Sequence, residues 1–273
     1  MTDHTPPAPR GRLLLIPNTL DLGCIPDGTP WPDVREVLPH SVLDAASQLT
    51  HWIAENAKTT RAFIKRVEAV RPLQRPVQEH LIQVLPRPDK GRPERGRPGA
   101  ASGQADAVVR QLLNPALEGH DVGLISEAGL PAVADPGAAV VLAAHRLGIP
   151  VLALAGPSSL MLALAASGLQ GQSFAFVGYL PVDQGERQQK IRELEQWSRK
   201  QQQTQLAIET PYRNPALWQA LLDTLQPDTL LSVSCGLTLP DGWSRTDTVA
   251  RWRQATTNLP THIPAVFAWL ARG

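Results

Sequence analysis

Short, continuous apolar runs that alternate with helical patterns place the strongest constraint on the fold of this sequence. Residues 13–16, 122–125 and 151–154 are such runs, and loops containing Gly or Pro follow them. Unbroken apolar runs of this length are typical of strands buried on both faces, as in a parallel sheet. Helical spacing between the runs, over 42–70 as one or two helices and over 138–147 as another, supplies the crossovers that parallel strands need. The N-terminal part is therefore predicted to be α/β, with a parallel sheet.

A second alternation follows further along the chain. Strands are predicted over 174–177, 205–208 and 230–233, a charged surface helix lies over 186–200, and 266–270 is a last short element. A joint between domains is expected at residues 168–172. We therefore expect a disordered lead-in over residues 1–10, a first α/β domain over 11–170 and a second over 171–273.

Composition removes several classes of function. The chain has 26 basic and 25 acidic side chains, which excludes a protein coated all round with positive charge for nucleic acid. Its two cysteines, Cys24 and Cys235, form neither a disulfide framework nor a zinc motif, so no metal site is expected and a reducing cytoplasm fits best. No apolar run approaches the roughly 18 residues of a membrane span.

The segment 126–137 reads SEAGLPAVADPG, between a predicted strand and a predicted helix. Loops that leave the carboxyl ends of strands form the ligand crevice of an open parallel sheet. Gly129 and Gly137 allow a close approach of backbone to a ligand, while the prolines hold the loop in one shape. An ordinary strand-to-helix connection explains the same residues, and at this point both interpretations stay open.

The segment 155–159, AGPSS, repeats this arrangement after another predicted strand. Ser158 can cap the following helix, and the free amides of that helix then face outward toward a polar ligand group. Neither loop matches GxxxxGK[ST] or GxGxxG, which disfavours an enzyme that uses a nucleoside triphosphate or a dinucleotide.

The order strand, S-E-A-G-x-P-x-x-A-D-P-G, helix, strand, G-P-S-S, helix, A-S-G-L resembles the tetrapyrrole methylase superfamily. Within it, the chain is most similar to the branch of the ribosomal RNA cytidine 2′-O-ribose methyltransferases. Three further segments resemble this branch. Ala54-Glu55 together with Arg61 resembles its A-E-D-T-R motif, and the others are G-Y-L-P at 178–181 and E-T-P-Y-R at 209–213. The match rests on the order of the motifs along most of the chain.

This resemblance implies a homodimer of two-domain subunits, with a parallel N-terminal sheet, a mixed C-terminal sheet and S-adenosylmethionine as cofactor. The cofactor contacts that it implies fall on Ser126, Glu127, Ala128, Gly129, Asp135, Gly156, Pro157, Ser158, Ser159 and, more weakly, Thr238.

Methyl transfer needs alignment of the nucleophile with the methyl group and, for a hydroxyl, removal of a proton. Glu55 and Glu209 are the candidates for positioning or proton removal, although Glu55 also fits a solvated carboxylate on a helix face. Arg213 either binds an anionic substrate or pairs with Glu209.

The sequence departs from the branch pattern at three places. The loop after the first strand, which contains Asn18, reads PNTLDLG at 17–23, where the branch usually has P-I-G-N-L-x-D, so the glycine that approaches the ligand is displaced. Asn56 replaces the aspartate of A-E-D-T-R, and Glu127 replaces the aspartate of S-D-A-G. These changes bear on the methyl acceptor more than on the cofactor.

Three functions follow as hypotheses. The first is methylation of a ribose 2′-hydroxyl in ribosomal RNA, with the five basic residues between Arg87 and Arg97 adding salt-sensitive affinity for RNA or serving only as a polar linker. The second is methylation of a tetrapyrrole or another small molecule. The third is binding of S-adenosylmethionine without turnover.

Overall fold

A computed structural model describes residues 10–21, 23–25, 28–86 and 103–272 of the chain. Two compact units make up the structure: Met1–Thr19 with Pro32–Pro157, and Leu20–Trp31 with Ser158–Gly273. The basic segment from Arg87 to Arg97 and nearly all of the expected lead-in lie outside the described residues.

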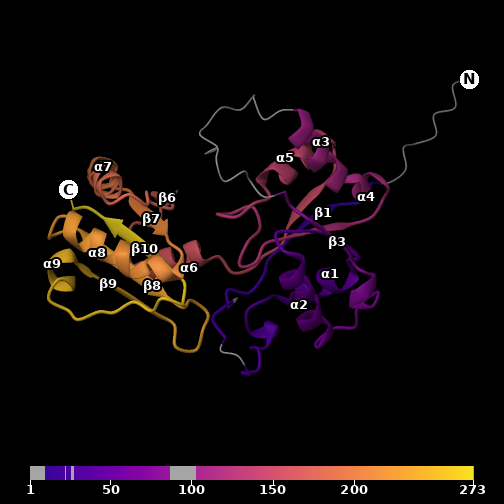
Figure 1. Cartoon of the computed structure of the whole chain (residues 1–273), viewed down its shortest axis with the longest axis horizontal. Coiled ribbons are helices and arrows are strands. Elements are labelled where there is room, and N and C mark those ends of the chain that lie inside the picture. Colours follow the sequence, from indigo (N-terminus) through magenta and orange to yellow (C-terminus); the bar gives the residue numbers. More distant parts are fainter. Residues whose placement is uncertain (1–9, 22, 26–27, 87–102, 273) are drawn as a thin grey trace, which may run out of the picture. The chain divides into compact units, whose positions relative to one another are not determined.

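The first unit is built on a five-stranded sheet in the order β3-β2-β4-β1-β5, and every neighbouring pair is parallel (Figure 1). This confirms the predicted parallel N-terminal sheet. Its strands are β1 (Leu13–Ile16), β2 (His51–Ala54), β3 (Leu81–Val84), β4 (Val122–Ile125) and β5 (Val151–Ala153).

The expectation of helix throughout residues 42–70 was wrong, because β2 lies between two helices in that range. Trp52 and Ile53 pack on opposite faces of the sheet, in two separate clusters of buried side chains. A short apolar run fits a strand and a buried helical turn equally well, and only the pairing with β4 and β3 decides between them.

Helices cover both faces of this sheet. Successive residues of a strand point to opposite faces, so Leu14 and Ile16 pack with α1 and α2 while Leu13 packs toward α3 and α5. The helical elements of this unit are α1 (His40–Gln48), α2 (Ala57–Glu68), α3 (Gly103–Leu112), α4 (Asn114–Leu117) and α5 (Ala138–Arg146), with 3-10 turns at Val34–Glu36 and Val77–Glu79.

The second unit contains a mixed sheet in the order β6-β7-β10-β8-β9. β6 runs parallel to β7 and the remaining pairs are antiparallel, which confirms the predicted mixed C-terminal sheet. Its strands are β6 (Phe174–Gly178), β7 (Thr204–Ile208), β8 (Leu230–Cys235), β9 (Trp243–Thr248) and β10 (Ala265–Leu270).

One face of this sheet is covered by α6 (Ser159–Ser167), and the other by α7 (Gln184–Gln201), α8 (Asn214–Thr224) and α9 (Val249–Trp252). Leu160 and Leu164 of α6 pack with Leu206 of β7, and Ser167 O accepts a hydrogen bond of 2.7 Å from Thr246 Oγ1. The units therefore divide before α6, upstream of the joint that the sequence suggests at 168–172. The helix is apolar all round, so its sequence does not show which sheet it covers.

Gly123 in the central strand β4 is tightly enclosed, which generates a first prediction. A Cβ at this position would lie 2.8 Å from Leu49 Cδ1 and 2.9 Å from Trp52 Cε3. We expect Gly123→Ala to lower the free energy of unfolding by about 1–3 kcal/mol through overpacking, measured by urea denaturation. Gly171→Ala is the matched control, because a Cβ there meets nothing within 4 Å. Equal stability of the two variants would contradict the packing described.

Candidate active site

Asn18 fastens together the loops that follow two adjacent strands. Asn18 N donates to Gly129 O at 2.9 Å and Gly129 N donates to Asn18 O at 3.2 Å. The Asn18 side-chain amide donates to the carbonyls of Ser126 and Glu127, at 3.2 and 3.0 Å. β1 and β4 are parallel neighbours, so both loops leave the carboxyl edge of the sheet, where ligands bind in folds of this kind. The departure at Asn18 thus has a structural role, and its place two residues after a strand is the sequence signal for that role.

Ser126, the first residue after β4, carries a buried hydroxyl. The residue is 4% exposed, and its Oγ has no hydrogen-bond partner among the described residues. A buried hydroxyl without a partner costs about 1–3 kcal/mol, so its retention here is explained by a polar group that arrives with a ligand.

Three carboxyl groups gather at the same edge. Glu55 follows β2 instead of lying on a helix, and its Oε2 accepts a hydrogen bond from Glu127 N at 3.2 Å. Burial raises the pKa of Glu55. Burial first, and then the charges of Glu55 and Glu127, raises the pKa of Asp135 to about 7. Within the part of the chain that the structure describes, no basic side chain contributes to either shift, so the cluster favours a cationic ligand.

The loop that holds Asp135 contains strained backbone. Ala132 and Ala134 have φ values of 65° and 64°, and Gly129 and Gly137 also have positive φ. The left-handed conformation costs an alanine about 1–2 kcal/mol, so packing and hydrogen bonds around the loop must hold it in this shape. Ala128, predicted to contact the cofactor, lies half-buried in the same loop.

The loop after β5 packs against the end of β1. A Cβ at Gly156 would lie 2.2 Å from Pro17 Cβ, so this approach requires glycine, and Pro157 beside it is buried. Ser158 caps α6 as expected, because its Oγ accepts a hydrogen bond from Met161 N, and Ser159 begins the helix.

Asn56 also has a local explanation. Its side chain caps α2 by accepting a hydrogen bond from Lys58 N at 2.9 Å. Asp and Asn are about equally good at this position, so the replacement of the family's aspartate preserves the helix start.

In the second unit, Glu209 follows β7 and is already paired. One carboxylate oxygen accepts from Thr210 N at 2.8 Å, and the other lies 3.0 Å from Arg213 Nη2. The pairing alternative for Arg213 is therefore the one that the structure contains, and proton removal by Glu209 stays a prediction. Thr238 lies exposed after β8 with a φ of 69°, and its contact with a cofactor stays a prediction as well.

No cluster of three His, Cys, Asp or Glu side chains suited to a metal ion occurs within the part of the chain that the structure describes. Within the same residues, no helix is both long and apolar enough to cross a bilayer.

Residues 57–250 match the sequence profile of the Tetrapyrrole (Corrin/Porphyrin) Methylases. The chain belongs to this family. The resemblance stated from the motifs is thereby confirmed.

Relatives and solved structures extend this comparison. Ribosomal RNA small subunit methyltransferase I of Halalkalibacterium halodurans is 36% identical over 108 residues, covering 40% of this chain and 36% of that protein. The protein of the same name from Vibrio cholerae is 37% identical over 114 residues, covering 42% and 38%. The matched stretch thus spans less than half of either relative.

Two solved methyltransferases share the fold at low identity. The methyltransferase CobJ aligns with a TM-score of 0.53 at 16% identity, covering 94% of this chain and 93% of CobJ. The Thermus thermophilus uroporphyrin-III C-methyl transferase complexed with S-adenyl homocysteine aligns with a TM-score of 0.50 at 17% identity, covering 95% and 97%.

The raised pKa of Asp135 generates a prediction about stability. Its pKa in the folded chain, about 7, lies above the value of about 3.9 expected in the unfolded chain, so the folded state holds the proton more tightly. This contribution is complete below about pH 4 and is lost as the pH rises through 7. We expect the wild type to lose about 1–2 kcal/mol relative to Asp135→Asn between pH 4.5 and pH 8, the full shift being reduced by solvent screening.

Urea denaturation at a series of pH values measures this difference. Asp241→Asn, at an exposed aspartate, is the control and should keep the pH dependence of the wild type. Parallel curves for the wild type and Asp135→Asn would show that the carboxyl group of Asp135 is not perturbed.

Proposed function

We propose that this chain is an S-adenosylmethionine-dependent methyltransferase that acts on a ribose 2′-hydroxyl of ribosomal RNA. The observation that carries the proposal is the carboxyl edge of the parallel sheet, where an unpaired buried hydroxyl lies in the same loop as carboxyl groups without basic partners. Membership of the tetrapyrrole methylase family and the names of the relatives support it.

The residues at this edge fit the chemistry of the cofactor. S-adenosylmethionine carries a positive sulfonium and an ammonium group, and the carboxyl groups of Glu55, Glu127 and Asp135 favour positive charge. Ser126 Oγ is available to a polar group of the ligand. Because Asn18 already holds the loop through hydrogen bonds, binding of the cofactor costs little loop entropy.

In the proposed reaction, the cofactor supplies a methyl group whose bond to sulfur breaks as the acceptor oxygen bonds to carbon, and sulfur keeps the electron pair. The chain must orient the acceptor and take the proton of its hydroxyl. Glu55 suits the second task better than Glu209, because burial raises its pKa and no cation among the described residues neutralises it. Glu209 is neutralised by Arg213 and suits a positioning role.

Ribosomal RNA is a better-supported acceptor than a tetrapyrrole. The relatives named as ribosomal RNA methyltransferases are 36–37% identical over their matched stretches. The uroporphyrin-III C-methyl transferase is only 17% identical, and that likeness supports the fold alone. The main argument for binding without turnover was the departure from the family pattern at Asn18 and Asn56. Both residues have structural roles, so that argument is weakened.

Ser126→Ala tests the cofactor site. Removal of a hydroxyl that has no protein partner should leave the free energy of unfolding unchanged or slightly raised, while the affinity for S-adenosylmethionine falls about tenfold in isothermal titration. Ser167→Ala is the matched control, because Ser167 Oγ donates to Leu164 O at 2.7 Å. That variant should lose stability and keep its affinity. Unchanged affinity in Ser126→Ala would remove Ser126 from the site.

The acceptor is tested by nucleoside mass spectrometry of ribosomal RNA from a strain that lacks the gene. We expect loss of one 2′-O-methylated nucleoside and its return when the wild-type chain is restored, but not when Glu55→Gln is restored. An unchanged methylation pattern in the deletion strain would exclude ribosomal RNA. Activity on a tetrapyrrole extract without RNA would instead support the small-molecule alternative.

We also propose that the chain is a homodimer and works in the cytoplasm. The family resemblance supports the first statement, and the second follows from the proposed substrate. Sedimentation equilibrium of the purified chain at micromolar concentration measures the first, and a monomer would contradict it.

A further inference from the structure

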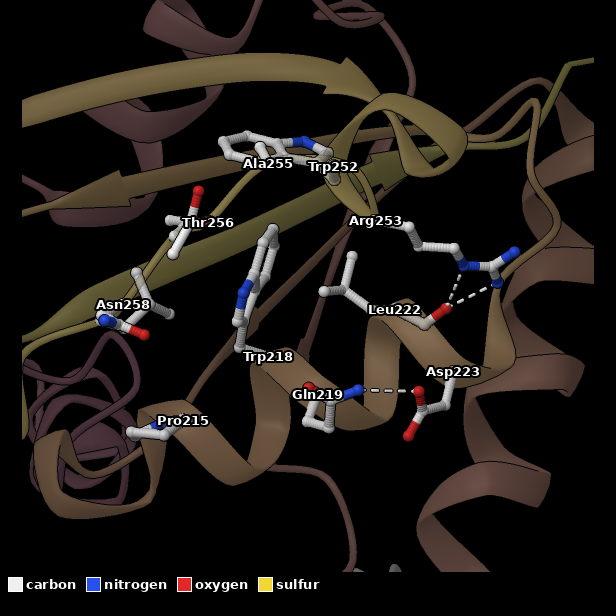
Figure 2. A pocket seen from close by; sticks show the side chains of 12 residues that line it. Pro215, Trp218, Gln219, Leu222, Asp223, Trp252, Arg253, Ala255, Thr256 and Asn258 are labelled. Atoms are coloured by element: carbon white, nitrogen blue, oxygen red, sulfur yellow. Dashed lines mark hydrogen bonds between the residues drawn. The ribbon is translucent and has the colours of Figure 1, made fainter.

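A pocket of about 600 Å³ lies within the second unit, between α8 and the segment that leads from α9 toward β10 (Figure 2). Its size falls within the roughly 300–1,000 Å³ of small-molecule sites. None of the residues assigned above to the cofactor or to catalysis lines it, and it opens on the face of the sheet opposite α6. The pocket therefore needs an explanation of its own.

The wall of this pocket contains a hydrogen-bond donor without a partner. Trp218 is 5% exposed, and its ring packs edge-to-face on Trp252 with centroids 5.0 Å apart. Its indole N–H has no hydrogen-bond partner within the described residues, although Trp252 Nε1 donates to Leu231 O at 2.8 Å. Figure 2 shows the Trp218 nitrogen on the edge of the ring that is turned toward Asn258. The N–H therefore faces the space of the pocket, where an acceptor of a ligand can reach it.

The other polar groups of the pocket are mostly uncharged. Asn258 offers an amide donor and an acceptor, and Thr256 and Thr257 add hydroxyl groups. The guanidinium group of Arg253 is occupied, because it donates to Leu222 O at 2.9 and 2.6 Å and to Leu225 O at 2.9 Å. These bonds hold Arg253 Nε and Nη2 on backbone carbonyls, and the carboxylate of Asp223, which also lines the pocket, disfavours a phosphate or a carboxylate ligand.

The apolar part of the lining completes the description of the occupant. Pro215, Leu222 and Ala255 provide surface for a flat, weakly polar ring, while the donors and acceptors lie at its edge. An uncharged heterocycle with a hydrogen-bonding edge fits this distribution. Asn recognises such an edge with paired hydrogen bonds, as it does with adenine.

We propose that this pocket binds a nucleobase, with the Trp218 indole N–H donating to a ring acceptor and the Asn258 amide pairing with the base edge. The base comes either from a free nucleoside or from an unpaired nucleotide of RNA. The proposal does not depend on methyl transfer, because it rests on groups that the proposed reaction does not use.

The experiment titrates the full chain, without S-adenosylmethionine, with adenosine, cytidine and uridine and with a single-stranded oligoadenylate. NMR of the tryptophan indole N–H groups is the readout, and the Trp218 resonance is the one missing from Trp218→Phe. We expect that resonance to shift on addition of a nucleoside, with millimolar affinity. Adenosine or cytidine should bind more tightly than uridine, because the Asp223 carboxylate can accept a hydrogen bond from an exocyclic amine.

Two variants and one control test the assignment. Trp218→Phe keeps one six-membered aromatic ring and removes the five-membered ring that carries the N–H, and Asn258→Ala changes an exposed loop residue. Each should weaken binding about five- to tenfold. Trp197→Phe, at a 51% exposed tryptophan of α7, should bind like the wild type.

The outcomes separate the two sources. Oligoadenylate that binds at least as tightly as adenosine supports an RNA base, and adenosine that binds while oligoadenylate does not supports a free nucleoside. No shift of the Trp218 resonance with any probe, or equal affinity of the wild type and both variants, would overturn the proposal. Loss of S-adenosylmethionine binding in Ser126→Ala bears only on the cofactor site, so the two proposals fail separately.

Discussion

The parallel pairing of β1 with β4 is the constraint on which the candidate active site depends. Because the two strands run side by side in the same direction, the loops that follow them emerge together, and Asn18 joins those loops through backbone and side-chain hydrogen bonds. β2 lies on the other side of β4 and delivers Glu55 to the same edge. A slip of this register would separate the carboxyl groups and the Ser126 hydroxyl from one another and break the Asn18 hydrogen bonds.

Burial of acidic groups at this edge is energetically unfavourable. Desolvation raises the pKa of Glu55 and Asp135, and two alanines in the same loop adopt left-handed backbone. In the proposed function a positively charged ligand relieves this cost, because no basic side chain among the described residues contributes to either pKa shift. Glu209 also follows a strand, but its carboxylate is already paired with the guanidinium group of Arg213.

Much of the fold was predictable from the residues. The apolar runs at 13–16 and 122–125 and the turn residues after them correctly indicated a parallel sheet. β2, β3 and β9 escaped prediction. His51–Ala54 lies inside a helical pattern, Leu81–Val84 is a four-residue segment interrupted by Gln83, and Trp243–Thr248 is largely polar, so none of them shows a periodicity of its own. The place of α6 escaped it as well, since a helix apolar on all sides is compatible with either sheet.

For the site, the sequence by itself determined which residue types follow each strand: Asn18, Glu55, the SEAG segment and Gly156. It also determined the family, because the order of motifs survives where single residues change. Only the tertiary structure decided that Asn18 holds the loop, that Glu209 is paired and that Trp218 lines a pocket beside Trp252. Hydrogen bonds and desolvation depend on which side chains meet in space, and those that meet here come from positions as far apart in sequence as Asn18 and Gly129.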